Sequence, residues 1–392
     1  MKVLVLGVIN SQWTFQFTKT FLRKNNYEIW MVKKGCDRES RKWVSLYTKI
    51  GVHFIDCTRQ AVHITEAKCE KSILKGLCAH IAYIRAIVQA GDFNVINMQY
   101  VNYDDVIHAA ILKYIIKAKL IYSYWGSDLL RLNGSQLYFN GFFVKHADFI
   151  TFDNRDLEFK FKETYAWASK IPSKTILFGL PVLDIIQGRA EEKTSENIRT
   201  KWEIPRDKKV IAVGYSAVAE HHHIEILRRI ERMDAEKKKE IFLLLQMTYN
   251  GTDRYIRQVA DAAKKTGCEY RVIRHYLTDE EVADLRIMTD IYINAQTTDA
   301  FSGSVCENLF AGTILINAEW LRYQEFKDYD FQYLEFQDMD EIGRLVQTAM
   351  EKKIDVSKNK KLVWQLRSWE CCALKWQRMF QRLLRENSRK RG

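Results

Sequence analysis

The chain has 392 residues, of which 47% are hydrophobic and 28% are charged, a composition typical of a soluble globular protein and not of a disordered or fibrous one. The length favours two domains. The 61 basic and 49 acidic side chains give a formal net charge of +12, which favours an anionic partner without choosing among nucleic acid, phospholipid and a phosphorylated small molecule.

The first half alternates apolar runs with helical patterns. We predict strands over residues 3–9, 27–32, 52–56, 95–98, 119–124, 149–152 and 175–181, and helices over residues 15–23, 73–90 and 104–117. No apolar run reaches the length of a membrane span, and the apolar start lacks a cleavage site, so we predict neither a membrane helix nor a signal peptide. The eight scattered cysteines are interpreted as reduced core thiols of a cytoplasmic protein.

The second half repeats this architecture. Strands are predicted over residues 209–213, 241–247, 269–273, 290–294 and 313–316, with helices over residues 222–232, 252–266, 278–287 and 303–311. The fold class is therefore α/β, with two doubly wound Rossmann-like domains facing a cleft. The predicted parts are residues 1–186, a polar linker over residues 187–206, a second domain over residues 207–358, and a basic C-terminal helix over residues 359–392 that returns to the first domain.

The turns with polar or small residues all follow predicted strands, at residues 7–11, 125–128, 214–223, 248–251, 274–277 and 299–307. Ligands of open α/β sheets bind at the carboxyl ends of the strands. In the last turn, Ser302, Gly303 and Ser304 begin a helix whose free N–H groups suit a diphosphate. Glu307 could accept two ribose hydroxyls and Asp299 could reach a sugar, although an ordinary helix start with two unrelated acids has the same pattern.

The sequence DAFSGSVCENLFAGTILI, from Asp299 onward, resembles the E-x7-E region of retaining GT-B glycosyltransferases, the clan of glycogen and sucrose synthases. The resemblance implies that Asp299 contacts the donor sugar, that Ser302, Gly303 and Ser304 hold the diphosphate, and that Glu307 binds the ribose. It also implies a nucleotide-diphosphate sugar as donor, retention at the anomeric carbon, and no metal or other cofactor. Asp299 stands where the family usually has Glu.

A second stretch, GYSAVAEHHHIE over residues 214–225, is similar to a segment of bacterial fucosamine-type transferases that build enterobacterial common antigen. The resemblance implies that His222 or His223 contributes to phosphate binding, with Ser216 and Tyr249 on the donor side. The Arg and Lys that many GT-B enzymes place here are absent. Solvent-facing histidines at a helix start remain the alternative.

The stretch YSYWGSD ends at Asp128 and resembles the H-G-S-D turn on the acceptor side of the family, with Trp125 in place of His. We assign Asp299 and Asp128 as candidate catalytic residues, although Asp128 also suits a helix N-cap. Should the reaction invert, Asp128 or His108 would be the candidate base. The remaining acceptor-side candidates are Ser11, Gly126 and Ser127. Arg274, His275 and Tyr276 follow a strand whose end meets the nucleobase in the family, and a packed aromatic is the alternative.

Two D-x-D matches, at residues 328–330 and 338–340, are interpreted as chance, and no metal site is predicted. The C-terminal pattern places Trp376, Met379, Phe380 and Leu383 between basic residues. It suits either a helix packed on the domains or one that contacts anionic lipid on the inner face of the plasma membrane. The apolar strands argue against nucleic-acid binding.

The predicted function is transfer of a sugar from a nucleotide-diphosphate sugar to a glycan or lipid-linked acceptor of surface-polysaccharide synthesis. A sugar-nucleotide epimerase of the same fold is one alternative. A non-catalytic partner protein that has kept the fold is the other, because Trp125 replaces a His and the Arg and Lys pair is missing.

Overall fold

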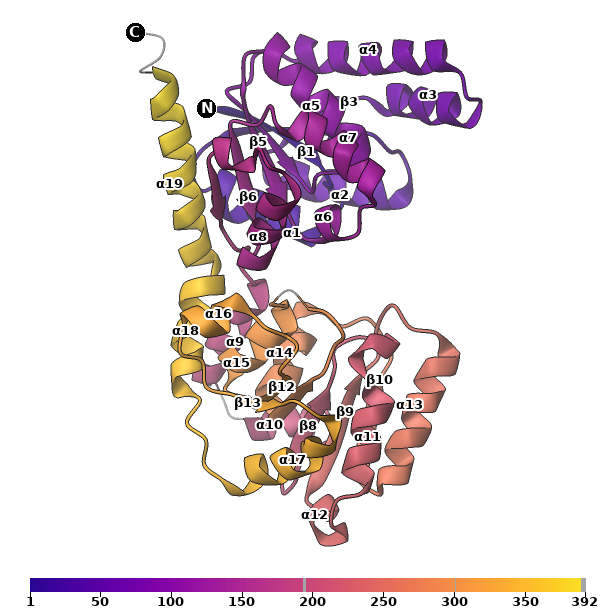
Figure 1. Ribbon diagram of the computed structural model, residues 1–392, viewed down its shortest axis with the longest axis vertical. Helices are drawn as coiled ribbons and strands as arrows, with labels where there is room; N and C mark the ends of the chain where they lie inside the picture. Colours follow the sequence, from indigo (N-terminus) through magenta and orange to yellow (C-terminus); the bar gives the residue numbers. More distant parts are fainter. Residues whose placement is uncertain (193–194, 300, 389–392) are drawn as a thin grey trace. The chain divides into compact units, whose positions relative to one another are not determined.

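The computed structural model describes residues 1–192, 195–299 and 301–388, and the chain divides into two compact units. The first unit comprises Met1–Phe178 together with the C-terminal residues from Cys372 onward, and the second comprises Gly179–Cys371. Each unit is a parallel α/β sheet covered by helices (Figure 1).

The sheet of the first unit has seven parallel strands in the described chain, in the order β3-β2-β1-β4-β5-β6-β7. The strands are β1 (Lys2–Gly7), β2 (Glu28–Lys33), β3 (His53–Asp56), β4 (Val95–Gln99), β5 (Lys119–Tyr124), β6 (Phe149–Phe152) and β7 (Ser173–Thr175). Strands β1, β2 and β3 follow one another towards one edge of the sheet. Strand β4 then pairs with the other side of β1, and the strands from β4 to β7 follow one another towards the opposite edge. The strand predicted over residues 175–181 is wrong for most of its length, because β7 ends at Thr175 and Pro181 already begins a helix.

The helices of the first unit are α1 (Gln12–Phe17), the π-helical turn η1 (Thr18–Leu22), α2 (Arg38–Lys49), α3 (Thr58–Cys69), α4 (Ile73–Gln89), α5 (Tyr103–Ile115), α6 (Ser127–Leu130), α7 (Gly134–Val144), α8 (Arg155–Thr164) and the 3-10 turn η2 (Ala168–Lys170). Helices α4, α5 and α8 contribute Tyr83, Leu112 and Phe161 to a cluster of buried side chains that also contains residues of the sheet, such as Leu4 and Ile96. Helices α2, α3, α7 and α8 were not predicted from the sequence. Helix α8, for example, buries only Leu157 and Phe161, too few apolar positions for a clear helical period.

The sheet of the second unit has six parallel strands in the described residues, in the order β10-β9-β8-β11-β12-β13. They are β8 (Lys209–Val213), β9 (Ile241–Gln246), β10 (Glu269–Ile273), β11 (Ile291–Asn294), β12 (Ile314–Ala318) and β13 (Leu334–Phe336). Around them lie η3 (Ala219–His221), α11 (His223–Glu231), α12 (Ala235–Lys239), α13 (Asp253–Thr266), α14 (Asp279–Met288), α15 (Gly303–Ala311), α16 (Gln324–Asp328), η4 (Met339–Glu341), α17 (Ile342–Glu351) and α18 (Ser357–Arg367). The five strands and four helices predicted for this half are confirmed to within about two residues.

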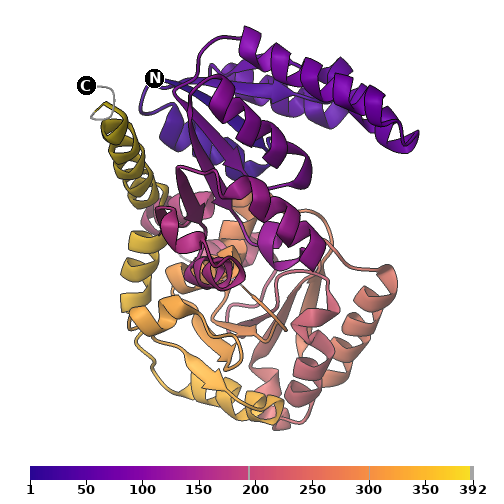
Figure 2. The same cartoon turned by 45° about the horizontal axis from the view of Figure 1, so that its top comes forward.

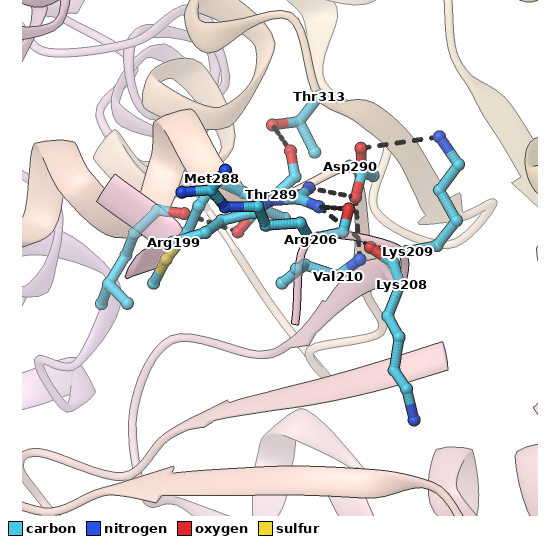
Figure 3. A network of polar contacts seen from close by, with 10 residues as sticks. Arg199, Arg206, Lys208, Lys209, Val210, Met288, Thr289, Asp290 and Thr313 are labelled. Atoms are coloured by element: carbon cyan, nitrogen blue, oxygen red, sulfur yellow. Dashed lines mark hydrogen bonds and ion pairs between the residues drawn. The ribbon is translucent and has the colours of Figure 1, made fainter. Parts of the chain in front are cut away.

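The segment predicted as a linker is largely helical. Helices α9 (Pro181–Glu192) and α10 (Ser195–Lys201) occupy it, and residues 193–194 lie outside the described part of the chain. Arg199 anchors α10 to the second sheet: its Nη2 donates to Asp290 Oδ2 at 2.7 Å, and its Nη1 to the Lys208 carbonyl at 2.9 Å (Figure 3). Asp290 also accepts from the Val210 N–H at 2.8 Å, so the polar residues of this segment hold it against the sheet.

The C-terminal pattern forms two helices, α18 and α19 (Trp369–Ser388), separated at Ser368, whose backbone is extended. Trp376 and Phe380 of α19 are fully buried in the first unit. The ring of Trp376 lies 4.8 Å from that of Phe17, and the ring of Phe380 lies 5.1 Å from that of Phe21. The packing interpretation of this helix is therefore confirmed, and its apolar face is not available to a membrane. The basic residues predicted at 389–391 lie outside the described chain.

Replacement of Trp376 by Ala should lower the free energy of unfolding of the first unit by about 3–5 kcal/mol, because it leaves a large cavity among aromatic rings. Urea denaturation followed by circular dichroism would measure the loss. The matched control is Leu374→Ala on the same helix, where the side chain is exposed and the change should stay within about 0.5 kcal/mol. Equal effects of the two substitutions would contradict the packing described here.

The eight cysteines are all free thiols. Cys36, Cys69 and Cys78 are exposed, so the prediction that all eight lie in the core is wrong for these three. No helix among the described residues is both long and apolar enough to cross a bilayer.

Candidate functional site

The candidate donor site lies at the carboxyl edge of the second sheet, where β8 and β11 are neighbours and the chain leaves them in opposite directions. Such a reversal opens a crevice for ligands in α/β sheets. Gly214 follows β8 with φ +62°, and a Cβ at this position would lie 2.7 Å from His223 Nε2. Only glycine fits there, and helix α11 consequently begins close to the end of β8.

Helix α15 follows β11 and begins at this edge. Ser302 is its N-cap and accepts from the Val305 N–H at 3.4 Å. Asp299 lies on the approach loop, where its Oδ2 accepts from the Tyr323 hydroxyl at 2.6 Å and from the Ser302 N–H at 3.4 Å. Tyr323 is itself held by the Asn294 amide at 2.9 Å. The structure therefore brings Asp299, Ser302, Gly303 and Ser304 together and fixes the orientation of the first acid.

Glu307 lies one turn into α15 and is only 8% exposed. Its Oε2 accepts from Arg286 Nε at 3.1 Å, and Arg286 Nη1 donates to Gln246 Oε1 at 3.2 Å. Burial raises the pKa of Glu307, and the Arg286 guanidinium opposes that increase. Arg286 was missed from the sequence because it lies on α14, a different helix, and only the packing of α14 against α15 brings it to Glu307.

The three adjacent histidines have different environments. His221 and His223 are fully buried, with His221 Nε2 2.9 Å from Ser216 Oγ and His223 Nδ1 3.2 Å from the Tyr255 hydroxyl. Burial lowers the pKa of His221 to about 4 and that of His223 to about 3. His222 precedes α11 in the left-handed conformation and lies 3.3 Å from Thr297 Oγ1. Of the two predicted phosphate ligands, His222 is the more accessible one.

The other donor-side candidates lie at the ends of β9 and β10. The Tyr249 carbonyl accepts from the Ala217 N–H at 3.0 Å, which joins its loop to the one that follows β8. Arg274 is paired with Asp253. His275 lies 3.5 Å from Glu281, and Tyr276 is 82% exposed, so neither side chain is a core aromatic. An exposed ring at this edge is available to stack on a ligand.

The acceptor-side candidates belong to the first unit. Ser11 caps α1 and accepts from the Trp13 N–H at 3.2 Å. A cavity of about 340 Å³ is lined by residues at the ends of β1 and β2 and directly after them, including Gly7, Asn10, Lys33 and Lys34. A Cβ on Gly7 would lie 1.9 Å from the Gln99 carbonyl, so glycine is required where β1 and β4 meet.

Asp128 is 2% exposed and accepts three backbone N–H bonds, from Val101 at 2.9 Å, Trp125 at 3.0 Å and Gly126 at 2.8 Å. Burial raises its pKa to about 6, while these N–H groups oppose the increase. The N-cap of α6 is Gly126 and not Asp128. The Asp128 carboxylate therefore joins the end of β4 to the turn after β5 and holds that turn in position.

The rest of this turn is also held in place. Trp125 Nε1 donates to Gln99 Oε1 at 3.1 Å, and the Ser127 hydroxyl lies 3.1 Å from that of Tyr100. His108, the alternative base, is 3% exposed, and its Nε2 lies 2.8 Å from Nδ1 of His80. It lies on α5 and faces α4, and its burial speaks against direct contact with a substrate.

No family model and no curated protein matches the sequence. The structure, however, is similar to a glycosyltransferase from Rickettsia africae, with a TM-score of 0.75, 11% identity and 98% of both chains covered. HepE of Anabaena, solved in complex with UDP, matches with a TM-score of 0.72 and 12% identity over 97% of this chain and 100% of that one. Sucrose-phosphate synthase from Thermosynechococcus elongatus matches with a TM-score of 0.67 and 12% identity over 98% and 100%. The chain therefore has the GT-B fold of these proteins.

Proposed function

We propose that the protein is a glycosyltransferase that binds a nucleotide-diphosphate sugar at the carboxyl edge of its second unit. The observation that carries this proposal is Glu307, a nearly buried carboxylate held by Arg286 one turn inside a helix that begins at the strand reversal. An ionised carboxylate in that place can accept both hydroxyls of a ribose. The shared fold, and UDP in the HepE structure, support the assignment.

The start of α15 and the start of α11 would receive the diphosphate. Helix N-termini carry a partial positive charge and unpaired N–H groups, and α11 has no side-chain cap. As the bond to the sugar breaks, negative charge grows on the leaving diphosphate, and these groups, with His222, would stabilise it. Asp299, oriented by Tyr323, would contact the sugar, and Tyr276 or His275 would stack on the base.

The acceptor would bind the first unit near Ser11, Trp125 and Ser127, and we infer a lipid-linked or surface-polysaccharide acceptor. The motif around Asp299 favours retention, with the leaving diphosphate taking the proton of the attacking hydroxyl. Asp128 would position Trp125 and Gly126 without itself reacting, because backbone N–H groups occupy both of its oxygens. The likeness to fucosamine-type transferases stays a prediction.

Replacement of Glu307 by Gln should weaken binding of a nucleoside diphosphate by about 10- to 100-fold, the effect of losing hydrogen bonds to a charged group. Glutamine retains the shape and an acceptor for Arg286. Isothermal titration with UDP, and with GDP and ADP in parallel, would measure the change. The control is Glu236→Gln on α12, an exposed carboxylate of the same unit. Equal affinity in wild type and Glu307→Gln would remove the ribose assignment.

Turnover separates the proposal from its alternatives. Incubation with labelled sugar nucleotides should release nucleotide only when a membrane or glycan extract supplies an acceptor. Conversion of the sugar without an acceptor would identify an epimerase, and binding without any turnover would identify a non-catalytic protein.

A further inference from the structure

The outward surfaces of α4, α5 and α7 form one continuous surface of the first unit, which we call the α4–α5–α7 surface. The crossovers from β3 to β4, β4 to β5 and β5 to β6 all run in the same direction, so right-handed connections put these helices on one face of the sheet (Figures 1 and 2). His80 of α4 contacts His108 of α5 at 2.8 Å, and the Tyr114 hydroxyl of α5 reaches His146, just after α7, at 2.9 Å.

This surface is apolar where a helix surface is ordinarily polar. On α4, Leu74 is 73% exposed, Leu77 55% and Ile81 56%, at a spacing that places them along one stripe. The same exposure extends over the two neighbouring helices, at Ile111, Tyr114, Ile115, Tyr138 and Phe142. Contiguous exposed apolar side chains of this kind mark a surface that is covered by a partner.

Among the side chains of α4, α5 and α7 that the structure describes, the charges that reach the α4–α5–α7 surface have one sign. Helices α4 and α7 contain no Asp or Glu. Of the two acids of α5, Asp105 is buried and paired with Lys34, and Asp104 lies outside the described side chains. Arg85, Lys117 and Lys145 are exposed and have no acidic partner among the residues that the structure describes. Lys145 Nζ lies 4.2 Å from the centre of the Phe142 ring, so cations and apolar groups are interleaved.

We infer that the α4–α5–α7 surface docks on an anionic phospholipid bilayer. Leucine, isoleucine and phenylalanine side chains would enter the boundary between headgroups and acyl chains, the tyrosines would lie at headgroup depth, and the cations would meet lipid phosphates. A second copy of this chain fits poorly, because a two-fold contact would bring unpaired cations together. The inference is independent of the transferase activity, and it replaces α19, whose apolar face is buried, as the membrane contact.

Vesicle co-sedimentation of the full chain tests the inference. At low salt the protein should bind vesicles with about 30% phosphatidylglycerol at least tenfold more strongly than pure phosphatidylcholine vesicles, and about 0.5 M salt should remove the difference. A combined Leu77→Ser, Ile81→Ser and Phe142→Ser variant should bind both kinds at least tenfold more weakly. A combined Arg85→Gln, Lys117→Gln and Lys145→Gln variant should lose the preference for anionic vesicles.

The control variant is Leu374→Ser, an equally exposed side chain on α19, which should bind like wild type. Thermal melts should be alike for all variants, since every changed side chain is exposed. A wild type that ignores anionic vesicles at low salt would overturn the inference, as would either combined variant binding like wild type. So would a wild-type dimer in sedimentation velocity that the apolar variant dissociates, because the surface would then be an interface between copies.

Discussion

Lowering the pH from 7 to 5 should destabilise the second unit by about 4 kcal/mol through His221 and His223 alone. Burial lowers the pKa of His221 to about 4 and that of His223 to about 3, whereas a histidine in an unfolded chain titrates near 6.5. The unfolded chain therefore takes up protons first as the pH falls, and the equilibrium shifts towards unfolding. Each imidazole contributes about 2 kcal/mol between pH 7 and pH 5.

The physical cause lies in the packing at the start of α11. His223 is fully buried, and its Nε2 has no hydrogen-bond partner among the described residues and lies against Gly214. A second proton would put an uncompensated charge beside the candidate diphosphate site, although a bound diphosphate would itself offset part of that charge. Acid sensitivity should therefore be lower in the presence of a nucleoside diphosphate.

Urea denaturation at a series of pH values would measure the effect. A His221→Gln and His223→Asn double variant should show a shallower loss of stability below pH 6.5 than wild type, and the difference isolates these imidazoles from the carboxylates that also titrate. The control is His275→Gln, a half-exposed histidine of the same unit. Parallel pH profiles for wild type and the double variant would contradict the assignment.

Replacement of Glu307 by Ala should lower the free energy of unfolding of the second unit by about 3–5 kcal/mol, in addition to any loss of donor binding. Arg286 is almost fully buried, and without Glu307 its charge would keep only the Gln246 carbonyl oxygen as a described hydrogen-bond partner. From the sequence alone, Glu307 is a ligand-binding acid whose removal should leave the fold intact. The ion pair with Arg286 changes that expectation, and it is the reason for testing donor binding with Gln.

Chemical denaturation of a set of variants would resolve the two roles. Arg286→Met combined with Glu307→Leu should recover most of the lost stability, because an apolar pair of similar volume needs no compensation, and it should still fail to bind a nucleoside diphosphate. The control is Glu319→Ala, which breaks an exposed pair with Arg322 and should cost at most about 1 kcal/mol. An unchanged midpoint for Glu307→Ala would show that the pair adds nothing to stability.

Local pattern in the chain was sufficient for the alternation of strands and helices, especially in the second unit. Strands such as residues 241–246 are buried on both faces, so they appear as continuous apolar runs that need no knowledge of their neighbours. The turn that begins α15 was equally visible, because Ser302, Gly303 and Ser304 form a helix start with local capping chemistry. Among the helices that were missed, α3 and α8 bury only two residues each, so their helical period is weak. Helix α17 was missed although it buries Ile342, Leu345, Val346 and Ala349 at a helical spacing.

Contacts between residues that are distant in the chain could not be predicted from such local patterns. Arg286 meets Glu307 and Tyr323 meets Asp299 across 21 and 24 positions of sequence, and nothing in the pattern around any of them indicates the pairing. Three further features could not be predicted for the same reason. They are the burial of His221 and His223, the helical state of residues 181–192, and the apolar α4–α5–α7 surface. Each depends on which side chains the sheet order brings together, and strand order is set by packing over the whole unit and not by any local sequence.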